Sequence, residues 1–319
     1  MAAPPAPALV TALDDLLDLL DLERIEDRIF RGRNRPLASA RVFGGQVLAQ
    51  ALVAADRTVN GTADGADGGA GRSATGAKAR PCHSLHAYFL LPGDVQAPIV
   101  YDVETLRDGG SFSTRRVTAV QHGRPIFNAS VSFHRAEPGP DHQDDLGRDV
   151  PGPDGLRSER EIVEGLGDRV REPLRTVLTR ERPIDFRPVD PGDPLRPDPR
   201  PARADTWVRA AGALPDDPAL HQALLAYASD WGLLGAALLP HGRTVFDGTI
   251  QAASLDHSMW FHRPFRADAW LLYAVESPTA AGARGFTRGA VYDADGRLVA
   301  STVQEGLVRP VDPDRKRGR

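Results

Sequence analysis

The feature that most constrains the fold of this chain is an internal repeat with an offset of 172–174 residues. The stretches 83–92 and 254–265 both combine histidine and serine with aromatic and apolar residues, and His257 follows His83 by 257 − 83 = 174 residues. The run 273–277 repeats the pattern of 101–105 at an offset of 273 − 101 = 172. Several matches near one offset indicate a structural unit that occurs twice.

Bulk composition excludes several classes of protein. The 319 residues suggest about two domains, and 41% apolar residues are enough for two cores. The formal net charge of −4 gives no basis for binding nucleic acid. The single cysteine, Cys82, excludes an internal disulfide and fits a reducing compartment. With no basic signal-peptide start and no apolar run near the roughly 18 residues of a membrane span, we expect a cytoplasmic protein.

Each half of the repeat pairs one apolar helix with alternating strands. The helices predicted over 44–55 and 219–239 have almost no polar face, so each must be enclosed by other elements. The segments 83–134 and 254–308 alternate between apolar and polar residues and break at short turns, which predicts antiparallel meanders. We therefore predict an α+β double hot-dog fold: two tandem antiparallel sheets, each wrapped around one central helix and joined edge to edge.

Composition shifts suggest the domain boundaries. Pro/Gly/Asp-rich stretches separate the two repeats, and Ser158 and Glu161 have the spacing of a helix capping box. A low-complexity Gly/Ala/Asp insert interrupts the first repeat and is predicted to be disordered and dispensable. The predicted units are an N-terminal hot-dog domain over 1–136 with the insert at 60–81, a linker over 137–183 with a helix at 158–178, a C-terminal hot-dog domain over 184–310 and a basic tail over 311–319. Further strands are expected at 25–31, 184–189 and 206–210.

Three polar residues of the second half have no counterpart in the first. Aligning the two apolar helices puts Asp230 opposite the glycines at about Gly45, and aligning the last strands puts Gln304 opposite Ser132. Ser254 lies three residues before His257, whereas the corresponding residues 80–82 of the first half include no hydroxyl side chain. A carboxylate among apolar residues is costly to bury without hydrogen-bond partners, and a hydroxyl and an amide can supply them.

A carboxylate, a hydroxyl and an amide at one point can hold and activate a water molecule. The carboxylate can accept its proton, and an amide N–H can stabilise the oxygen of a polarised carbonyl. This set predicts hydrolysis of an activated acyl group without a covalent intermediate. The chain has no Gly-x-Ser-x-Gly nucleophile motif, and Cys82 has no activating base beyond His83. No metal-binding spacing accompanies the histidines, so no metal and no cofactor are expected.

Spacing alone leaves other roles open for these residues. Asp230 serves equally well as a residue at a helix end. Gln304 alone is more typical of a hydrogen bond within a sheet, and His257 and His262 are more typical of strand histidines with satisfied ring nitrogens than of ligands.

Several longer runs give the chain a specific resemblance. The runs are Arg41 to Val47, Tyr101 to Gly109, Tyr227 to Asp230, Leu255 to Phe265 and Ala300 to Gly306. In these runs the chain resembles the type II acyl-CoA thioesterases, which have a double hot-dog fold. The resemblance implies hydrolysis of fatty acyl-CoA to free acid and CoA, by a water activated between Asp230, Ser254 and Gln304.

The resemblance also carries expectations about binding and assembly. It implies that Gly45, Gln46 and His257 bind substrate, and that the chain forms a homo-oligomer of two or four copies. Serine at position 254 departs from the threonine that is common in the family; it keeps the hydroxyl and loses a methyl group that restricts the side-chain rotamer. Two alternatives remain: a non-catalytic acyl-CoA binding protein, and a 2-enoyl-CoA hydratase that uses Asp256 and His257 as an acid–base pair.

Overall fold

The computed structural model of the protein describes residues 11–35, 41–61 and 79–311, apart from residues 173, 196 and 247 and the side chain of Val177. Most of the insert predicted to be disordered and nearly all of the basic tail lie outside the described residues. The helices are α1 (Ala12–Leu20), α2 (Gly44–Asn60), α3 (Glu159–Gly165), α4 (Leu174–Thr179) and α5 (Pro218–Ser229), with 3-10 turns η1 (Gly167–Arg169), η2 (Leu233–Ala237) and η3 (Leu239–His241).

Thirteen strands form one sheet in which all neighbours are antiparallel. The strands of the first half are β1 (Glu23–Glu26), β2 (Ile29–Gly32), β3 (Cys82–Phe89), β4 (Ile99–Asp108), β5 (Phe112–Gln121) and β6 (Arg124–His134). Those of the second half are β7 (Ile184–Pro188), β8 (Arg203–Ala210), β9 (Ile250–Ser254), β10 (Asp256–Phe261), β11 (Leu271–Ala281), β12 (Arg284–Tyr292) and β13 (Leu298–Pro310). The order is β1-β2-β4-β5-β6-β3-β10-β13-β12-β11-β8-β7, and β9 also pairs with β13.

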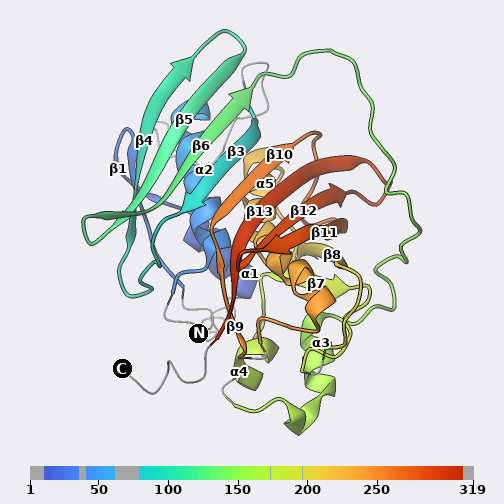
Figure 1. Ribbon diagram of the computed structural model, residues 1–319. Helices are drawn as coiled ribbons and strands as arrows, with labels where there is room; N and C mark the ends of the chain where they lie inside the picture. The colour runs from blue at the N-terminus through green and yellow to red at the C-terminus, as the bar shows by residue number, and fades with distance from the viewer. Residues whose placement is uncertain are drawn as a thin grey trace, which may run out of the picture.

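The two halves meet where the repeated histidine motifs pair with each other. Strand β3 runs antiparallel to β10, with His86 opposite Ser258, and their side chains form a hydrogen bond of 3.1 Å. The pairing covers what would otherwise be an exposed edge of each half-sheet (Figure 1). The predicted edge-to-edge junction of two antiparallel sheets is therefore confirmed.

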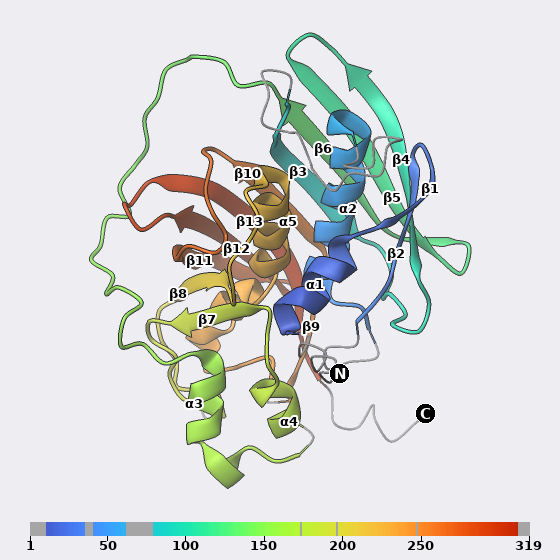
Figure 2. The ribbon, with the colours of Figure 1, turned by 180° about the vertical axis from the view of Figure 1, so that it is seen from behind.

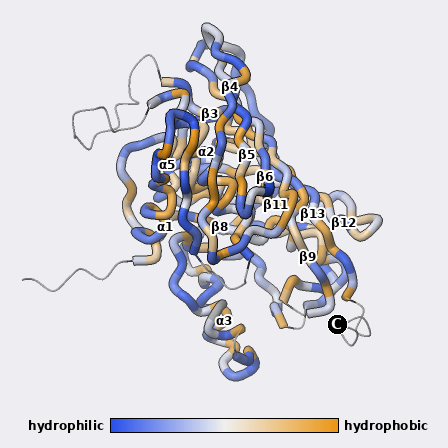
Figure 3. The backbone as a smooth tube through the Cα atoms, turned by 90° about the vertical axis from the view of Figure 1, so that its left-hand side faces the viewer, coloured by the Kyte–Doolittle hydropathy of each residue, from blue (hydrophilic) through white to orange (hydrophobic). Residues whose placement is uncertain are grey.

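Helices α2 and α5 lie side by side on one face of the sheet (Figure 2). All residues of α5 from His221 to Ser229 are buried, which explains why this helix has no polar face. Hydrophobic and hydrophilic residues are interleaved along strands such as β5 (Figure 3), in which every second residue is buried. These features confirm the predicted double hot-dog fold.

The apolar stretch 218–241 is long enough to cross a membrane by length and composition, the one described segment of which this is true. Of its most apolar window, 67% is buried inside the protein, so enclosure by the sheet explains its character. Gln222 and Asp230 lie within this stretch, so it is not an uninterrupted apolar run, as expected from the sequence.

Several predicted elements differ from the structure in their boundaries. The strand expected at 25–31 is a hairpin of β1 and β2. The helix expected at 158–178 is divided into α3, η1 and α4, although its capping box at Ser158 is present. The helix expected at 219–239 ends at Ser229, because Gly232 has φ +75 and starts a 3-10 turn. In the first half β3 does not pair with β4 but lies beyond β6, so only β4, β5 and β6 form a meander.

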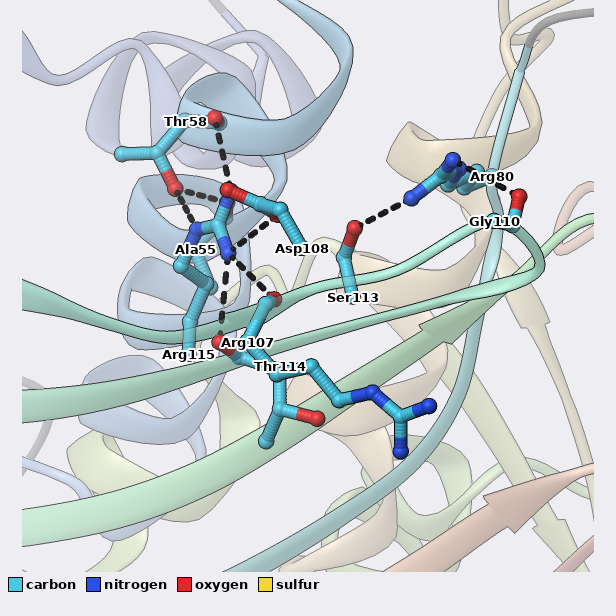
Figure 4. Close-up of polar contacts among 9 residues, drawn as sticks. All are labelled: Ala55, Thr58, Arg80, Arg107, Asp108, Gly110, Ser113, Thr114 and Arg115. Atoms are coloured by element: carbon cyan, nitrogen blue, oxygen red, sulfur yellow. Dashed lines mark hydrogen bonds and ion pairs between the residues drawn. The ribbon is translucent and has the colours of Figure 1, made fainter.

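A buried arginine joins the end of α2 to the hairpin of β4 and β5 (Figure 4). The guanidinium of Arg115 donates to the hydroxyl of Thr58 at 2.9 Å, to the carbonyl of Arg107 at 3.1 Å and to the carboxylate of Asp108 at 2.8 Å. Because Arg115 is buried, these bonds fix the C-terminal turn of α2 against the sheet. The insert starts directly beyond that turn.

The described ends of the insert are fixed to each other and to the sheet. The Asn60 side chain donates to the carbonyl of Arg80 and accepts from its backbone N–H, both at 3.0 Å. The Arg80 guanidinium donates to Ser113 at 2.6 Å and to the carbonyl of Gly110 at 3.0 Å (Figure 4). Contacts outside residues 62–78 therefore hold the two ends of the insert together.

We predict that residues 62–78 can be replaced by a short Gly/Ser linker without loss of function. Since Asn60 and Arg80 already meet, the replacement leaves their contacts in place, and a shorter loop lowers the entropy of loop closure slightly. Thermal melting and turnover of the shortened protein should match those of the parent. A large loss of turnover with normal melting would mean that the insert contributes to the active site.

Candidate functional site

Asp230 lies where the two halves of the protein meet. It follows the last residue of α5 as the C-cap, and its carboxylate accepts a hydrogen bond from the backbone N–H of Gly45 at the start of α2. A Cβ at Gly44 would lie 2.6 Å from the Asp230 carboxylate, and a Cβ at Gly45 would lie 2.3 Å from the carbonyl of Tyr227. The two glycines therefore let the N-terminus of α2 approach the carboxylate closely, where its positive dipole end is favourable.

The structure brings the three predicted catalytic side chains together. Ser254 donates its hydroxyl hydrogen to Asp230 Oδ1 at 2.9 Å, and Gln304 Nε2 donates to Ser254 Oγ at 2.9 Å. Gln304 is only 1% exposed, whereas Asp230 and Ser254 are partly exposed. The Gln304 amide therefore supports the hydroxyl and the carboxylate from within the sheet.

A β-bulge makes this convergence possible. Ser254 pairs with Gly306 and Ser258 pairs with Val303, so the three residues 255–257 lie opposite only the two residues 304–305. In a regular strand, residues 254 and 257 would point to opposite faces, because side chains alternate. The extra residue brings both side chains onto Gln304, and the Asp256 carboxylate accepts the Glu305 N–H at 2.7 Å beside the bulge.

His257 holds the amide of Gln304 in one orientation. An ionised Asp230 can only accept, so Ser254 donates to it and in turn accepts from the Gln304 amide nitrogen. The Gln304 Oε1 atom then accepts from Nδ1–H of His257 at 2.7 Å, and His257 Nε2 lies 3.0 Å from the hydroxyl of Ser229, which donates to the Ala226 carbonyl at 2.9 Å. Three hydrogen bonds, from His257 to Gln304, from Gln304 to Ser254 and from Ser254 to Asp230, thus run in one direction and end on the carboxylate.

Burial sets the charges of the two titratable groups in this chain. It raises the pKa of Asp230 to about 6, although hydrogen bonds from Ser254, Gly45 and Gln304 lower it in part. Burial lowers the pKa of His257 to about 4, so its imidazole is neutral at pH 7. The site therefore holds one carboxylate poised near neutral pH and no neighbouring positive side chain among its hydrogen-bond partners in the described residues.

The three residues expected to bind substrate have different roles in the structure. Gly45 contacts Asp230 as described. Gln46 is buried and its amide nitrogen donates to Asn34 Oδ1 at 2.8 Å and to the Arg33 carbonyl at 3.2 Å, so it secures the segment before α2. His257 is 0% exposed and is placed to position Gln304, with no surface for a substrate.

Sequence reasoning missed three residues that support the site. Ser229 bonds His257, and the Tyr273 hydroxyl donates to the Ser229 carbonyl at 3.1 Å and lies 2.8 Å from the hydroxyl of Thr302. Tyr273 stands in the repeated motif where the first half has Tyr101, whose hydroxyl donates to Gln50 Oε1 on α2 at 2.7 Å. The repeated tyrosine was the one signal in the sequence that pointed to this support.

The helix alignment used to compare the halves was wrong. Helix α2 begins at Gly44 and α5 at Pro218, a difference of 218 − 44 = 174 that agrees with the repeat. This offset puts Asp56 opposite Asp230, and Asp56 is also buried, with the Asn60 side chain donating to it at 2.7 Å. The halves therefore differ in their hydroxyl and amide groups rather than in the carboxylate.

Cys82 does not have the environment of a nucleophile. Its thiol is buried and donates to the carbonyl of Ser84 at 3.4 Å, and burial raises the pKa of the thiol. Within the part of the chain that the structure describes, no group of three or more His, Cys, Asp or Glu side chains is arranged to hold a metal ion.

Comparison with known proteins places both halves in one family. A family model described as acyl-CoA thioesterase matches residues 185–307, and one described as acyl-CoA thioesterase N-terminal domain matches residues 33–134. Acyl-CoA thioesterase 2 of Haemophilus influenzae is 40% identical over 297 residues, covering 93% of this chain and 98% of that protein. Human acyl-coenzyme A thioesterase 8 is 39% identical over 300 residues, covering 91% of this chain and 88% of that protein.

Solved structures agree with these relatives. The acyl-CoA thioesterase II TesB2 from Mycobacterium marinum has 40% identity and a TM-score of 0.71, covering 94% of this chain and 98% of that one. A hot-dog protein from Alicyclobacillus acidocaldarius, at 18% identity, covers 93% of this chain and 99% of its own with a TM-score of 0.70, which supports the fold alone. The chain therefore belongs to the acyl-CoA thioesterase family.

Proposed function

We propose that the protein hydrolyses fatty acyl-CoA to free fatty acid and CoA, with Asp230 as the general base for a water molecule positioned by Ser254 and Gln304. The observation that carries this proposal is a carboxylate with a pKa of about 6, bonded to a hydroxyl that is itself bonded to an amide. A base whose pKa lies just below the working pH is ionised and still accepts a proton readily.

The reaction needs one proton to move twice. Asp230 removes a proton from water as the water oxygen attacks the thioester carbonyl carbon, and a tetrahedral intermediate forms. The carbon–sulfur bond then breaks, and the proton on Asp230 passes to the departing thiolate of CoA. The Gln304 amide and the Gly45 N–H are fixed by their bonds to Ser254 and Asp230 before reaction, so the hydroxyl and the base need little reorganisation.

Two other chemistries differ from this route in testable ways. A covalent route through Ser254 would use the same carboxylate as its base, because the Ser254 hydroxyl donates to Asp230 and His257 bonds Gln304 and Ser229 instead; it would differ in forming an acyl-enzyme. A hydratase route requires Asp256 and His257 to act on one substrate, but they are adjacent on β10 and point to opposite faces. A binding protein without catalysis would not require a water-activating set.

The proposal extends to location and assembly. A cytoplasmic location is supported by the single cysteine, which fits a reducing compartment. A homo-oligomer is supported by Tyr88, Leu90 and Leu91, which expose apolar side chains close together at the end of β3, with Tyr88 58% exposed.

We predict that Asp230→Asn lowers turnover by about 10²–10⁴-fold, the range for loss of general acid–base catalysis. Because the three groups act on one water, Asp230→Asn combined with Gln304→Ala should cost little more than the worse single change. Ser254→Thr should retain activity and Ser254→Ala should lose much of it.

Release of free thiol from acyl-CoA measures these effects, and intact-mass analysis of the quenched reaction tests for an acyl-enzyme. Full activity in Asp230→Asn would exclude Asp230 as the base. An acyl adduct on Ser254 at steady state would exclude the direct attack of water.

We predict that kcat/KM rises with pH through about 6 and is flat above pH 7, because the base must be ionised. Ser254→Ala removes a hydrogen bond that lowers this pKa, so the rise should move to higher pH in the residual activity. Because the pKa of Asp230 is higher in the folded protein than in the unfolded chain, this group stabilises the fold when it is protonated. Its contribution to the free energy of unfolding is fully present below about pH 4 and is lost as the pH rises through about 6. A profile that is flat from pH 5 to 8 would contradict the assignment.

We predict that His257→Leu lowers kcat by roughly tenfold or more with little change in KM, because the Gln304 amide loses the donor that orients it. The same variant should move the acid limb of the pH profile, which a general loss of stability would not do. His257→Asn, which can still donate to Gln304, is the matched control and should restore part of the activity.

A double-mutant cycle isolates the positioning role. In a Gln304→Ala background, His257→Leu should have little further effect on kcat, since its target is absent. Additive losses would show that His257 acts by another route.

A further inference from the structure

The bulge at residues 255–257 takes a main-chain acceptor away from one backbone donor of β13. The Leu255 N–H donates to the carbonyl of Glu305 at 3.0 Å. In a regular antiparallel pair the Glu305 N–H would return a bond to the carbonyl of the same residue. The Leu255 carbonyl is turned towards β3 instead, where it accepts from the Phe89 N–H at 2.9 Å. The carbonyl that Glu305 would use is therefore occupied by the other half of the sheet.

The carboxylate of Asp256 replaces this acceptor. Its Oδ1 atom accepts from the Glu305 N–H at 2.7 Å, and the charge of the carboxylate strengthens such a bond. A backbone N–H that loses its partner in a partly buried position is costly, so the bond favours the bulged register over a regular one. Asp256 is the first residue of β10 and lies within the bulge. Its side chain therefore holds the bulge from within.

The bond between Asp256 and Glu305 lies beside the catalytic groups. Asp256 comes two residues after Ser254, and Glu305 directly follows Gln304. The bond thus joins the two strands next to the place where Gln304 Nε2 donates to Ser254 Oγ at 2.9 Å. In the described part of the chain, the Asp256 carboxylate forms no hydrogen bond with the three catalytic side chains. Any effect of Asp256 on the site must therefore pass through the backbone.

The first half has the bulge but not the carboxylate. Cys82 pairs with Phe133 and Ser84 pairs with Ser132, so residue 83 has no partner on β6. The position equivalent to 256 is 256 − 174 = 82, where the thiol of Cys82 donates to the Ser84 carbonyl at 3.4 Å. A carboxylate needed only to stabilise a bulge would serve equally well in both halves. Its presence only in the half with the water-activating set favours a role in the site.

We propose that Asp256 is a positioning residue for the hydrolysis, which fixes the bulge so that Ser254 and Gln304 stay bonded to each other. The inference rests on the proposed function and deepens it, because it attributes the geometry of the water-activating set to one contact between a side chain and the backbone. Asp256 acts as an acceptor in a fixed place, and neither its charge nor its proton takes part in the reaction.

Three substitutions at position 256 separate acceptor geometry from charge. Asp256→Asn keeps an acceptor oxygen in place without the charge and should retain most of the turnover. Asp256→Ala removes the acceptor, and Asp256→Glu keeps the charge but moves it by one methylene group. Both should lower kcat for acyl-CoA by about tenfold or more with little change in KM, because small displacements of groups at a reaction centre are costly. In a Ser254→Ala background, Asp256→Ala should have little further effect.

Asp268→Ala is the matched control for a lost carboxylate. Asp268 also accepts from a backbone N–H of the second half, that of Leu214, at 2.9 Å. The adjacent Ala267 bonds His221 near the start of α5, at the opposite end of this helix from Asp230. Asp268→Ala should therefore lower the melting temperature and leave kcat unchanged.

The pKa of Asp230 provides a second readout that needs no substrate, by titration of its carboxyl carbon with ¹³C NMR. The Ser254 hydroxyl lowers this pKa, so it should be higher than in the parent in Asp256→Ala and Asp256→Glu, and close to the parent in Asp256→Asn. If Asp256→Ala does not fold, the comparison of Asp256→Glu with Asp256→Asn decides.

Two results would overturn the inference. Equal losses of kcat in Asp256→Asn and Asp256→Ala would show that Asp256 acts by its charge or its proton. Parent values of both kcat and the Asp230 pKa in the folded variants that lack a placed acceptor would show that the site does not depend on this bond. Absence of thiol release from every acyl-CoA in the parent would instead overturn the proposed function, and the titration of Asp230 would still test the positioning role.

Discussion

The burial of one carboxylate is the constraint on which the arrangement of this protein depends. Asp230 lies at the end of α5 among apolar residues, where an unpartnered charge is strongly unfavourable. The second half supplies Ser254 and Gln304 as donors, and the first half supplies the N–H of Gly45. The two halves must therefore stay packed together for the site to exist, which the β3–β10 pairing and the contact of α2 with α5 ensure.

The repeated unit has diverged in the groups around its carboxylate. In the first half Asp56 is buried at the position equivalent to Asp230, but an asparagine side chain bonds it. Arg80 stands 254 − 80 = 174 residues before Ser254, and its guanidinium holds the end of the insert against the β4–β5 hairpin. The same scaffold thus carries a water-activating set in one half and structural contacts in the other, and the family relationship explains the shared scaffold.

Much of the fold could be predicted because its signals are periodic and local. The repeat, the apolar helices and the alternating strands lead directly to two sheets wrapped around two helices. The errors occurred where single residues decide the backbone: Gly232 ends α5 early, and the segment 158–178 breaks into short helices that mainly cover a cavity. Neither event changes the hydrophobic period; the signs in the sequence were single helix-breaking residues, Gly165, Gly167 and Pro173 in the first segment and Gly232 in the second.

The sequence by itself determined which residue types were present for hydrolysis: a carboxylate in an apolar helix, and a hydroxyl and an amide beside repeated strands. It could not decide that they meet. Residues 254 and 257 differ by three, so strict alternation would place them on opposite faces of the sheet. Only the bulge opposite residues 304–305 turns both towards Gln304, and only the packing of α2 against α5 brings Gly45 to Asp230. Register and helix packing depend on contacts between residues far apart in the chain, which no local pattern encodes.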